Sequence, residues 1–157
     1  KKALALGSDL IMEMDADFSH DPKDLTRLID ACKNKVDLAI GSRKIRGGKI
    51  VGWNWRRHLM SSGAMWLSRL LLGLKTKDVT AGFRCFRRQV LEKINLSTIK
   101  SNGYAFQEEL LYKTEKLGFI TKEIPVIFKE RENGQSKLGK KEIKEFFVII
   151  FKLKFKK

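Results

Sequence analysis

Residues 13–22, EMDADFSHDP, bring several acidic side chains and one histidine together directly after a short apolar run. Carboxylates this close repel one another, and each loses hydration when partly buried, so the group requires a compensating partner. Asp15 and Asp17, separated by one residue, are compact oxygen ligands of the kind that Mg²⁺ and Mn²⁺ prefer. A metal bound there could neutralise a leaving diphosphate. The alternative is a solvated turn that caps the next helix, with His20 in a local hydrogen bond.

Arginines supply the second set of candidates, because a guanidinium group can bind two phosphate oxygens at once. Arg43 ends a predicted strand, Arg57 lies on a predicted helix, and Arg131 ends a later strand. Ser61 shares a helix face with Arg57, since residues four apart are neighbours on a helix. Each arginine could equally form a surface ion pair. If they converge on one cleft, they form a phosphate site.

The elements that must position these residues follow a strand–helix–strand order. Residues 9–15 are predicted to be a buried strand, residues 20–35 a helix that starts at Asp21, and residues 36–43 a second strand. A unit of this length indicates a parallel sheet, in which ligands bind beyond the carboxyl ends of the strands. The aspartate pair and Arg43 both fall at such ends.

The rest of the chain continues the alternation of helices and strands that an α/β fold requires. Gly7 ends a short helical segment at the start, and Pro125 favours an edge position for its strand. The predicted further elements are a glycine-rich loop at 44–54, helices at 55–73, 88–94, 103–118 and 140–157, and strands within 77–88 and at 121–131.

The composition favours a folded domain with an anionic partner. At 157 residues the chain is about one domain, and its 43% hydrophobic content is enough for a core. A net charge of +15 indicates nucleic acid, anionic lipid or phosphorylated substrates as partners. Cys32 and Cys85 lack the spacing of a zinc site or a disulfide framework, so we expect free thiols. No apolar run is long enough to cross a membrane.

Residues 137–157 combine a basic charge with an apolar helical face. They contain eight Lys and two Glu, a net charge of +6. This pattern is typical of an interfacial helix whose apolar side enters the lipid boundary and whose lysines face anionic headgroups. The residues assigned to the apolar side are Ile143, Phe146, Phe147, Ile150 and Phe151. We therefore divide the chain into a domain at 1–136 and a membrane-interface helix at 137–157. A core-packing helix and the start of a membrane span are the alternatives.

Six segments, considered together, resemble one family. They are MDADFSHDP, DLAIGSR, GGKIVGWNWRRHLMSSGA, DVTAGFR, GYAFQEEL and FKERENGQSKLG, and their order extends through nearly the whole chain. The set is similar to the polyprenyl-phosphate (dolichol-phosphate) mannosyltransferases, which are family 2 inverting glycosyltransferases of the GT-A fold. The resemblance implies an α/β, Rossmann-like fold with a mixed, mainly parallel sheet flanked by helices. It also implies that the family's upstream nucleotide-binding segment is missing, so we expect these 157 residues alone to have negligible transferase activity.

The resemblance implies a role for each candidate residue. Asp15 and Asp17 would hold Mg²⁺ or Mn²⁺ on the donor diphosphate, and Ser19 would be a weak further ligand. The residues that would act on the substrates are Arg43, Arg57 and Ser61 at the acceptor phosphate, and Arg131, Ser136 and Lys137 from the late loop. Asp78 and Gln107 or Glu108 match motif positions near the sugar or in the structural frame, and Gln107 is counted among the substrate-binding residues. Catalysis would depend on Asp15, Asp17, Arg43, Arg57 and Arg131.

The implied reaction moves mannose from GDP-mannose to a polyprenyl phosphate in a single inverting displacement. The protein would be peripheral on the cytoplasmic membrane face and would not bind nucleic acid. One alternative is a glucosyl- or aminosugar transferase of the same fold. A basic nucleic-acid-binding module and a non-catalytic membrane scaffold are others. The clustering of lysines and aromatic residues in one terminal helix favours lipid over nucleic acid.

Overall fold

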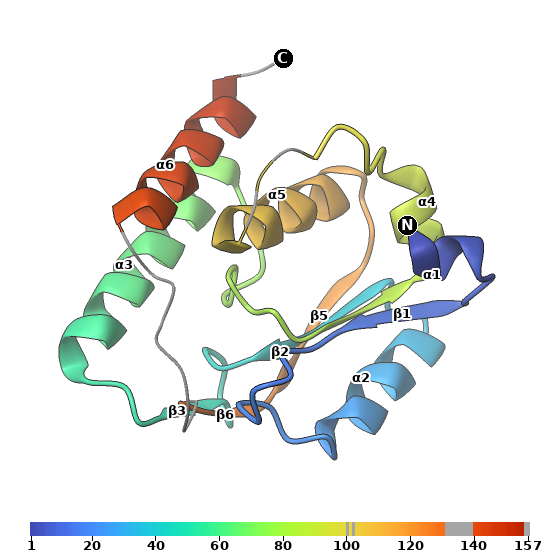
Figure 1. Cartoon of the computed structure of the whole chain (residues 1–157), viewed down its shortest axis with the longest axis horizontal. Helices are drawn as coiled ribbons and strands as arrows, with labels where there is room; N and C mark the ends of the chain where they lie inside the picture. Colours follow the sequence, from blue (N-terminus) through green and yellow to red (C-terminus); the bar gives the residue numbers. More distant parts are fainter. Residues whose placement is uncertain (100, 102, 131–139, 156–157) are drawn as a thin grey trace.

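The described residues form a four-stranded sheet at the centre of the molecule, with helices on both of its faces (Figure 1). The structure is a computed structural model and describes residues 1–99, 101, 103–130 and 140–155, without the side chains of 140–143. The strands lie in the order β1 (Leu10–Glu13), β4 (Arg84–Arg87), β2 (Leu38–Ser42) and β5 (Thr121–Pro125). The helices are α1 (Lys2–Ala5), α2 (Asp24–Lys33), α3 (Trp55–Leu72), α4 (Arg88–Lys93), α5 (Gly103–Lys116) and α6 (Lys140–Phe155).

The predicted mixed, mainly parallel sheet is confirmed, with one strand in an unexpected place. β2 pairs with β5 in parallel. β4 lies between β1 and β2 and is antiparallel to both, so β1 and β2 run in the same direction without touching. The predicted strand–helix–strand unit therefore exists, but a strand from later in the sequence is inserted at its centre. β4 suits this position because most of its side chains are buried.

Side chains alternate between the two faces of the sheet and form two apolar clusters. In β2, Leu38 and Ile40 join a cluster with residues of α3, α4 and α5. Ala39, between them, joins the opposite cluster, which contains Cys32 of α2 and Cys85 of β4. Both cysteines are buried free thiols, as the sequence predicts. Because both faces are covered, ligands can approach the sheet only at the ends of its strands.

The two helices nearest the candidate residues begin in different ways. α3 starts after Asn54, whose side-chain oxygen accepts a hydrogen bond from the Arg57 backbone N–H at 2.9 Å. This is an ordinary N-cap, and it places Arg57 in the first turn. α2 starts at Asp24, later than the predicted start at Asp21, because the Asp21 carboxylate accepts a backbone hydrogen bond within the preceding turn.

The chain forms a second, two-stranded parallel sheet after it leaves the main one. In this sheet β3 (Lys49–Val51), which comes after β2, pairs with β6 (Ile127–Lys129), which comes after β5. The sequence prediction is wrong here, because residues 44–54 contain a strand and the predicted strand at 121–131 is split in two. The split follows Pro125, the last residue of β5, after which Val126 N–H donates to Ser42 O at 3.0 Å and the chain leaves the main sheet. The edge position predicted from Pro125 is confirmed, since β5 is an outer strand.

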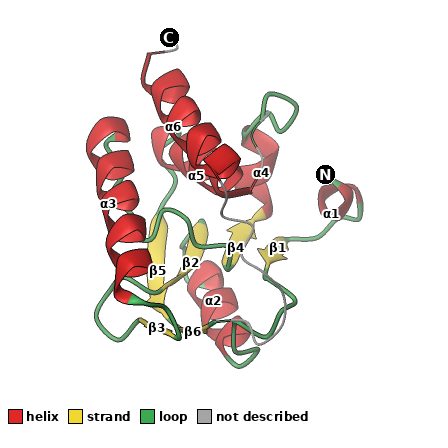
Figure 2. Cartoon of the chain, turned by 60° about the vertical axis from the view of Figure 1, so that its left-hand side comes forward, coloured by secondary structure: helices red, strands yellow, loops and turns green. Residues whose placement is uncertain are grey.

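The terminal helix α6 packs against α3 and α5 (Figure 2). Phe146 and Ile150 are 6% and 0% exposed, so the prediction that these two side chains enter lipid is wrong. They are buried because α3 and α5 lie directly beside them and offer apolar surface. Phe151 is exposed, whereas the side chain of Ile143 lies outside the described part of the chain. None of the helices that the structure describes is long and apolar enough to cross a bilayer.

Helix α5 carries one carboxyl group, that of Glu108, in the protein interior. Glu108 is fully buried, and neither of its carboxyl oxygens has a hydrogen-bond partner among the described residues. Burial raises the pKa of Glu108 to about 8, and the nearby Ser68 hydroxyl of α3 offsets only part of this effect. The side chain is therefore mostly protonated at neutral pH, because an ionised carboxylate buried without a partner is strongly unfavourable.

Glu108 makes the stability of this domain depend on pH. Between its ordinary pKa of 4.5 and about 8, the folded protein keeps a proton that the unfolded chain has released. The free energy of unfolding therefore falls as the pH rises through this window. We predict that the wild type loses about 2–4 kcal/mol relative to Glu108→Gln between pH 5 and pH 8, measured by urea unfolding. Glu92→Gln, at an exposed position, should track the wild type at both pH values. A constant difference between wild type and Glu108→Gln would contradict the prediction.

Candidate functional site

The candidate residues gather at one edge of the main sheet, where β1 and β2 end and the chain enters β4. Asp15 follows β1 and Arg43 follows β2, as the strand positions predict. The segment that leads into β4 carries Asp78 and Gly82. Gly82 lies beside the first aspartate, since a Cβ built on it would be 3.6 Å from Asp15 Oδ2. A carboxylate and an arginine from separate strands therefore share this edge.

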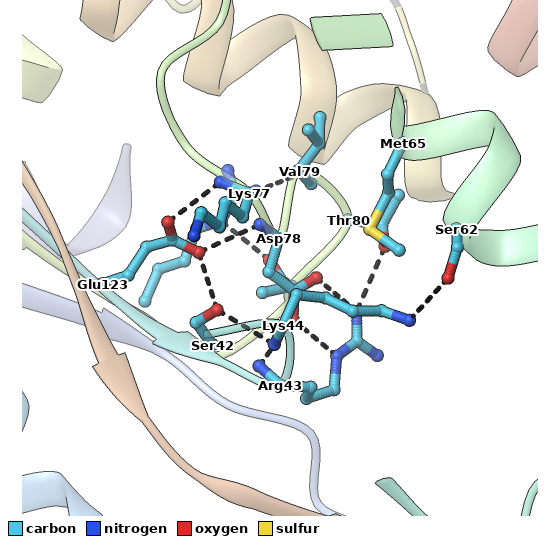
Figure 3. Close-up of polar contacts among 12 residues, drawn as sticks. Ser42, Arg43, Lys44, Ser62, Met65, Lys77, Asp78, Val79, Thr80 and Glu123 are labelled. Atoms are coloured by element: carbon cyan, nitrogen blue, oxygen red, sulfur yellow. Dashed lines mark hydrogen bonds and ion pairs between the residues drawn. The ribbon is translucent and has the colours of Figure 1, made fainter. Parts of the chain in front are cut away.

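A buried ion pair between Arg43 and Asp78 occupies the centre of the site (Figure 3). Arg43 donates to Asp78 Oδ2 from its backbone N–H and from Nε, both at 2.8 Å, and to Oδ1 from Nη2 at 2.6 Å. Nη2 also donates to Thr80 Oγ1 at 3.1 Å. Burial by itself would lower the pKa of Arg43, but the hydrogen bonds and charge of Asp78 outweigh it and raise the pKa. The guanidinium group is thus locked in one orientation.

Asp78 is in turn held by Glu123 of β5. The Glu123 carboxylate accepts from the Asp78 N–H at 3.0 Å and from the Ser42 hydroxyl at 2.6 Å. The residue after Arg43, Lys44, donates from Nζ to Ser62 Oγ of α3 at 3.1 Å, as Figure 3 shows. Strands β2 and β5 and helix α3 are therefore joined by polar contacts around the ion pair.

Next to this network the structure encloses a cavity of about 590 Å³. Arg43, Arg57 and Ser61 line it, so three predicted acceptor-site residues come together as the sequence analysis expects. Most of the other lining side chains are apolar or aromatic: Trp53, Leu59, Met60, Ala64, Tyr104, Phe146 and Phe147. The cavity is therefore cationic in one part and apolar in the rest.

Arg57 is oriented by an aromatic ring and a carboxylate. Its guanidinium carbon lies 4.1 Å from the centre of the Trp53 ring, a cation–π contact, and its Nη1 forms an ion pair with Glu130 Oε1. Arg43 contacts the same ring at 5.8 Å. Trp53 is therefore a shared support for both arginines.

Asp15 and Asp17 lie on the loop after β1. The Asp15 side chain is 62% exposed. Asp17 Oδ1 accepts from the Ser19 N–H at 3.1 Å and from the Ser19 hydroxyl. Ser19 is buried and its hydroxyl donates to Asp17, so it orients that carboxylate. Its role as a weak metal ligand stays a prediction.

The aspartate pair fits Mg²⁺ or Mn²⁺ as a partial ligand set. These ions take several oxygen ligands from water and substrate phosphates, so two protein carboxylates are sufficient at a nucleotide-sugar site. Among the described residues there is no cluster of three or more His, Cys, Asp or Glu side chains that could hold a metal by itself. The chemistry of the site thus favours a metal that arrives with, or is completed by, a diphosphate.

His20 lies between the aspartates and the arginine cavity. Its ring is buried, 4.8 Å from that of Phe83 and 5.4 Å from that of Phe128, and its Nε2 is 3.8 Å from Asp15 Oδ2. Burial lowers the pKa of His20, although the Asp15 charge acts in the opposite direction. On the other side, Arg43 packs over the Phe128 ring at 5.3 Å. The predicted local hydrogen bond is not seen, because Nδ1 has no partner in the described part of the chain.

Gln107 does not line the cavity, and its place near the sugar stays a prediction. Its side-chain Nε2 donates to Glu13 Oε1, and its backbone carbonyl accepts from Arg84 Nη1 at 2.7 Å. Arg84 is fully buried, and burial lowers its pKa to about 10. The amide is therefore used to hold α5 to the ends of β1 and β4.

The remaining predicted residues, Arg131, Ser136 and Lys137, lie outside the described residues. Conversely, the sequence analysis did not identify Trp53, Phe128 or Glu130 as site residues. The only available signal was their presence in two of the segments that carry the resemblance, GWNW before α3 and FKER after β5. Their spacing contains no catalytic pattern, because their role arises from β3 and β6 lying side by side.

Comparison with known proteins identifies relatives of the chain. The family model described as "Glycosyl transferase family 2" matches residues 3–95. The chain is 48% identical over 142 residues to a polyprenol monophosphomannose synthase of Mycolicibacterium smegmatis, covering 90% of the chain and 54% of that protein. It is 44% identical over 136 residues to an undecaprenyl-phosphate mannosyltransferase of Micrococcus luteus, covering 87% and 56%. A dolichol-phosphate mannosyltransferase of Pyrococcus furiosus is 37% identical over 147 residues, covering 92% and 40%. The chain thus spans about half the length of these relatives.

A solved structure shows the same fold. Glucosyl-3-phosphoglycerate synthase from Mycobacterium tuberculosis, in complex with phosphoglyceric acid, matches with a TM-score of 0.65 at 17% identity, over 98% of this chain and 52% of that chain. A second structure of that enzyme, with Mn²⁺, UDP-glucose and phosphoglyceric acid, matches with a TM-score of 0.61 at 16% identity, over 96% and 52%. The expected GT-A arrangement is therefore confirmed at the level of the fold.

The ion pair at the centre of the site generates a stability prediction. Asp78→Asn keeps the shape of the side chain but leaves Arg43 buried without its counter-charge. We expect the free energy of unfolding to fall by about 3–5 kcal/mol, the usual cost of breaking a buried pair by removing one partner. Urea unfolding would measure it. Glu92→Gln, which breaks the exposed pair with Arg88, should cost under about 1 kcal/mol, and similar losses in both variants would contradict the assigned role.

Proposed function

The chain belongs to glycosyl transferase family 2, and from this premise we propose that it supplies the metal-binding and acceptor-binding part of a polyprenyl-phosphate mannosyltransferase. The observation that carries the proposal is the cavity in which Arg43 and Arg57 meet an apolar lining. His20 and Phe128 connect it to the loop of the two aspartates. The names of the relatives from Mycolicibacterium smegmatis and Micrococcus luteus support polyprenyl phosphate as the acceptor and mannose as the sugar.

The cationic part of the cavity suits a phosphate monoester. Such a group has its second pKa near about 6, so it is mostly dianionic at neutral pH and already nucleophilic. Arg57 and the Ser61 hydroxyl would hold its oxygens, while Arg43, fixed by Asp78, would set the position of the charge. Positioning two anionic substrates against their mutual repulsion is the main task of the protein in this reaction. We extend the same role to Arg131, Ser136 and Lys137.

Asp15 and Asp17 are the residues that would hold Mg²⁺ or Mn²⁺. When bound, the metal would offset the charge of the leaving nucleoside diphosphate. Ser19 keeps the Asp17 carboxylate in place through its N–H and hydroxyl. The acceptor oxygen then attacks the anomeric carbon from the side opposite the diphosphate, and a single displacement of this kind inverts that carbon.

The apolar lining would accept the first part of the lipid chain. Leu59, Met60, Phe146 and Phe147 surround the cavity on the side of α3 and α6. A pocket with a few charged groups and otherwise apolar walls is typical of an amphipathic small-molecule ligand. Because the lining includes two phenylalanines of α6, this helix serves the acceptor site as well as the surface.

We further propose that α3, with α6 beside it, docks on the cytoplasmic membrane face. Trp55, Leu59, Trp66 and Leu70 are all exposed and lie on one side of α3, within about 60° of one another at ideal helix geometry. Tryptophan is favoured at the lipid boundary, and the basic charge of the chain suits anionic cytoplasmic lipids. We therefore assign to α3 part of the lipid contact that the sequence analysis predicted for the apolar side of residues 137–157. Phe151 and Phe155 of α6 are also exposed and would add to this contact.

The transferase proposal predicts metal-dependent mannosylation of lipid phosphate. We suggest a chimera in which residues 1–157 replace the matching part of the Mycolicibacterium smegmatis relative, assayed with GDP-mannose, Mn²⁺ and undecaprenyl phosphate. Asp17→Ala should lower turnover about 100-fold or more, because the leaving diphosphate loses its metal. Asp30→Ala, at an exposed position on α2, should retain turnover. The 157 residues alone should show none. Transfer from UDP-glucose but not from GDP-mannose would favour a glucosyltransferase instead.

The membrane proposal predicts binding to anionic vesicles through α3. In flotation with phosphatidylglycerol-containing vesicles, Trp66→Glu should weaken binding about tenfold or more, since it removes a large apolar contact and adds a repelled charge. Leu6→Glu is the control, because Leu6 is also exposed but directly follows α1, which lies on the side of the molecule opposite α3 in Figure 1. Equal effects of the two variants would contradict docking through α3.

A further inference from the structure

Arg43 and Arg57, two of the three arginines that line the cavity, have counter-anions of very different kinds. Asp78, the partner of Arg43, is 0% exposed and accepts from three nitrogens of that residue. Glu130, the partner of Arg57, is 39% exposed and is contacted through a single guanidinium nitrogen. A buried pair with several hydrogen bonds is permanent, whereas an exposed single contact can exchange with another anion. Arg57 therefore has a counter-anion that a ligand can replace.

The backbone at the end of the β3–β6 pair holds Glu130 beside Arg57. The Glu130 N–H donates to Val51 O at 2.9 Å, which fixes the residue at the end of the β3–β6 pair. Gly52, which follows Val51, has a φ of +96°. A Cβ built on Gly52 would lie 2.7 Å from Glu130 Cβ and 3.3 Å from Glu130 Oε2. The absence of a side chain at Gly52 is therefore what lets the carboxylate fold over towards Arg57.

We propose that Glu130 is an exchangeable counter-anion of Arg57, displaced by the acceptor phosphate and restored when the product leaves. This inference rests on the proposed function of the cavity. In the reaction, a phosphate oxygen bonds to the anomeric carbon as the bond to the diphosphate breaks. The phosphate group becomes a diester, and its charge falls from about −2 to −1.

Because the product carries less negative charge than the substrate, it competes less well with Glu130 for Arg57. Any anion that binds Arg57 must first separate it from Glu130, at the same cost for substrate and product. A dianion gains more from the arginine than a monoanion does, so only the monoester overcomes this cost by a clear margin. Glu130 thus lowers the affinity of the site for the monoester and for the diester. The diester, which binds more weakly, is then released readily. Glu130 therefore sets how tightly Arg57 holds either ligand, and it leaves the ratio of the two affinities unchanged.

The experiment measures small phosphates at the indole of Trp53, whose ring contacts Arg57. The chain has three tryptophans, so its indole N–H signals in an ¹⁵N NMR spectrum can be assigned with single Trp→Phe variants. Methyl phosphate, as the monoester, and dimethyl phosphate, as the diester, are titrated at pH 8 and low salt. Arg57→Gln should abolish the response of the Trp53 signal to both.

Glu130→Gln should tighten binding of both probes by roughly 2- to 5-fold, the range expected from the loss of an exposed competing ion pair. Glu92→Gln is the matched control, since it removes the same charge from an exposed pair elsewhere and should leave both affinities unchanged. Unchanged or weaker binding in Glu130→Gln, or equal tightening in Glu92→Gln, overturns the inference while the cavity keeps its proposed function. A wild-type Trp53 signal that responds to neither probe overturns both.

Discussion

The buried pair of Arg43 and Asp78 is the interaction on which the rest of the site depends. A guanidinium group at this depth requires partners for its charge and its N–H groups, and Arg43, directly after β2, finds them in Asp78 from a segment distant in sequence. Asp78 is held in turn by Glu123 of β5, which binds the Asp78 N–H. The ends of β2 and β5 and the entry to β4 are therefore tied together before any substrate is considered.

A second, apolar set of contacts joins the loop that carries Asp15 and Asp17 to the arginine cavity. His20 packs on Phe128 of β6, and Phe128 in turn contacts Trp53 at 6.1 Å. The backbone repeats the connection, since Lys129 N–H of β6 donates to Ser19 O at 3.0 Å. The aspartate loop and the arginine cavity are thus placed relative to each other by one short strand. A strand of this kind can position side chains that are themselves carried on loops at the edge of the sheet.

Sequence reasoning identified the parts of this site that depend on local chemistry. The aspartate pair follows a strand, and Arg57 and Ser61 share a helix face, because these features are set by neighbours in the chain. It could not place Glu130 or Phe128, whose role depends on a parallel pairing between β3 and β6 across more than 70 residues of sequence. Nor could it decide between lipid and protein for the apolar side of α6, since periodicity shows that a face is apolar but not what covers it.

The position of β4 has a consequence for how the chain acquires its structure. β1 and β2 are made first, yet neither can pair with the other, because the strand that joins them ends at Arg87. During synthesis on a ribosome, both strands must therefore wait until that residue has emerged, with their edges open to wrong partners. Sheets closed by such distant segments form slowly and are prone to aggregate on the way. The order of the strands in this chain thus leaves the facing edges of β1 and β2 unpaired until β4 has been made.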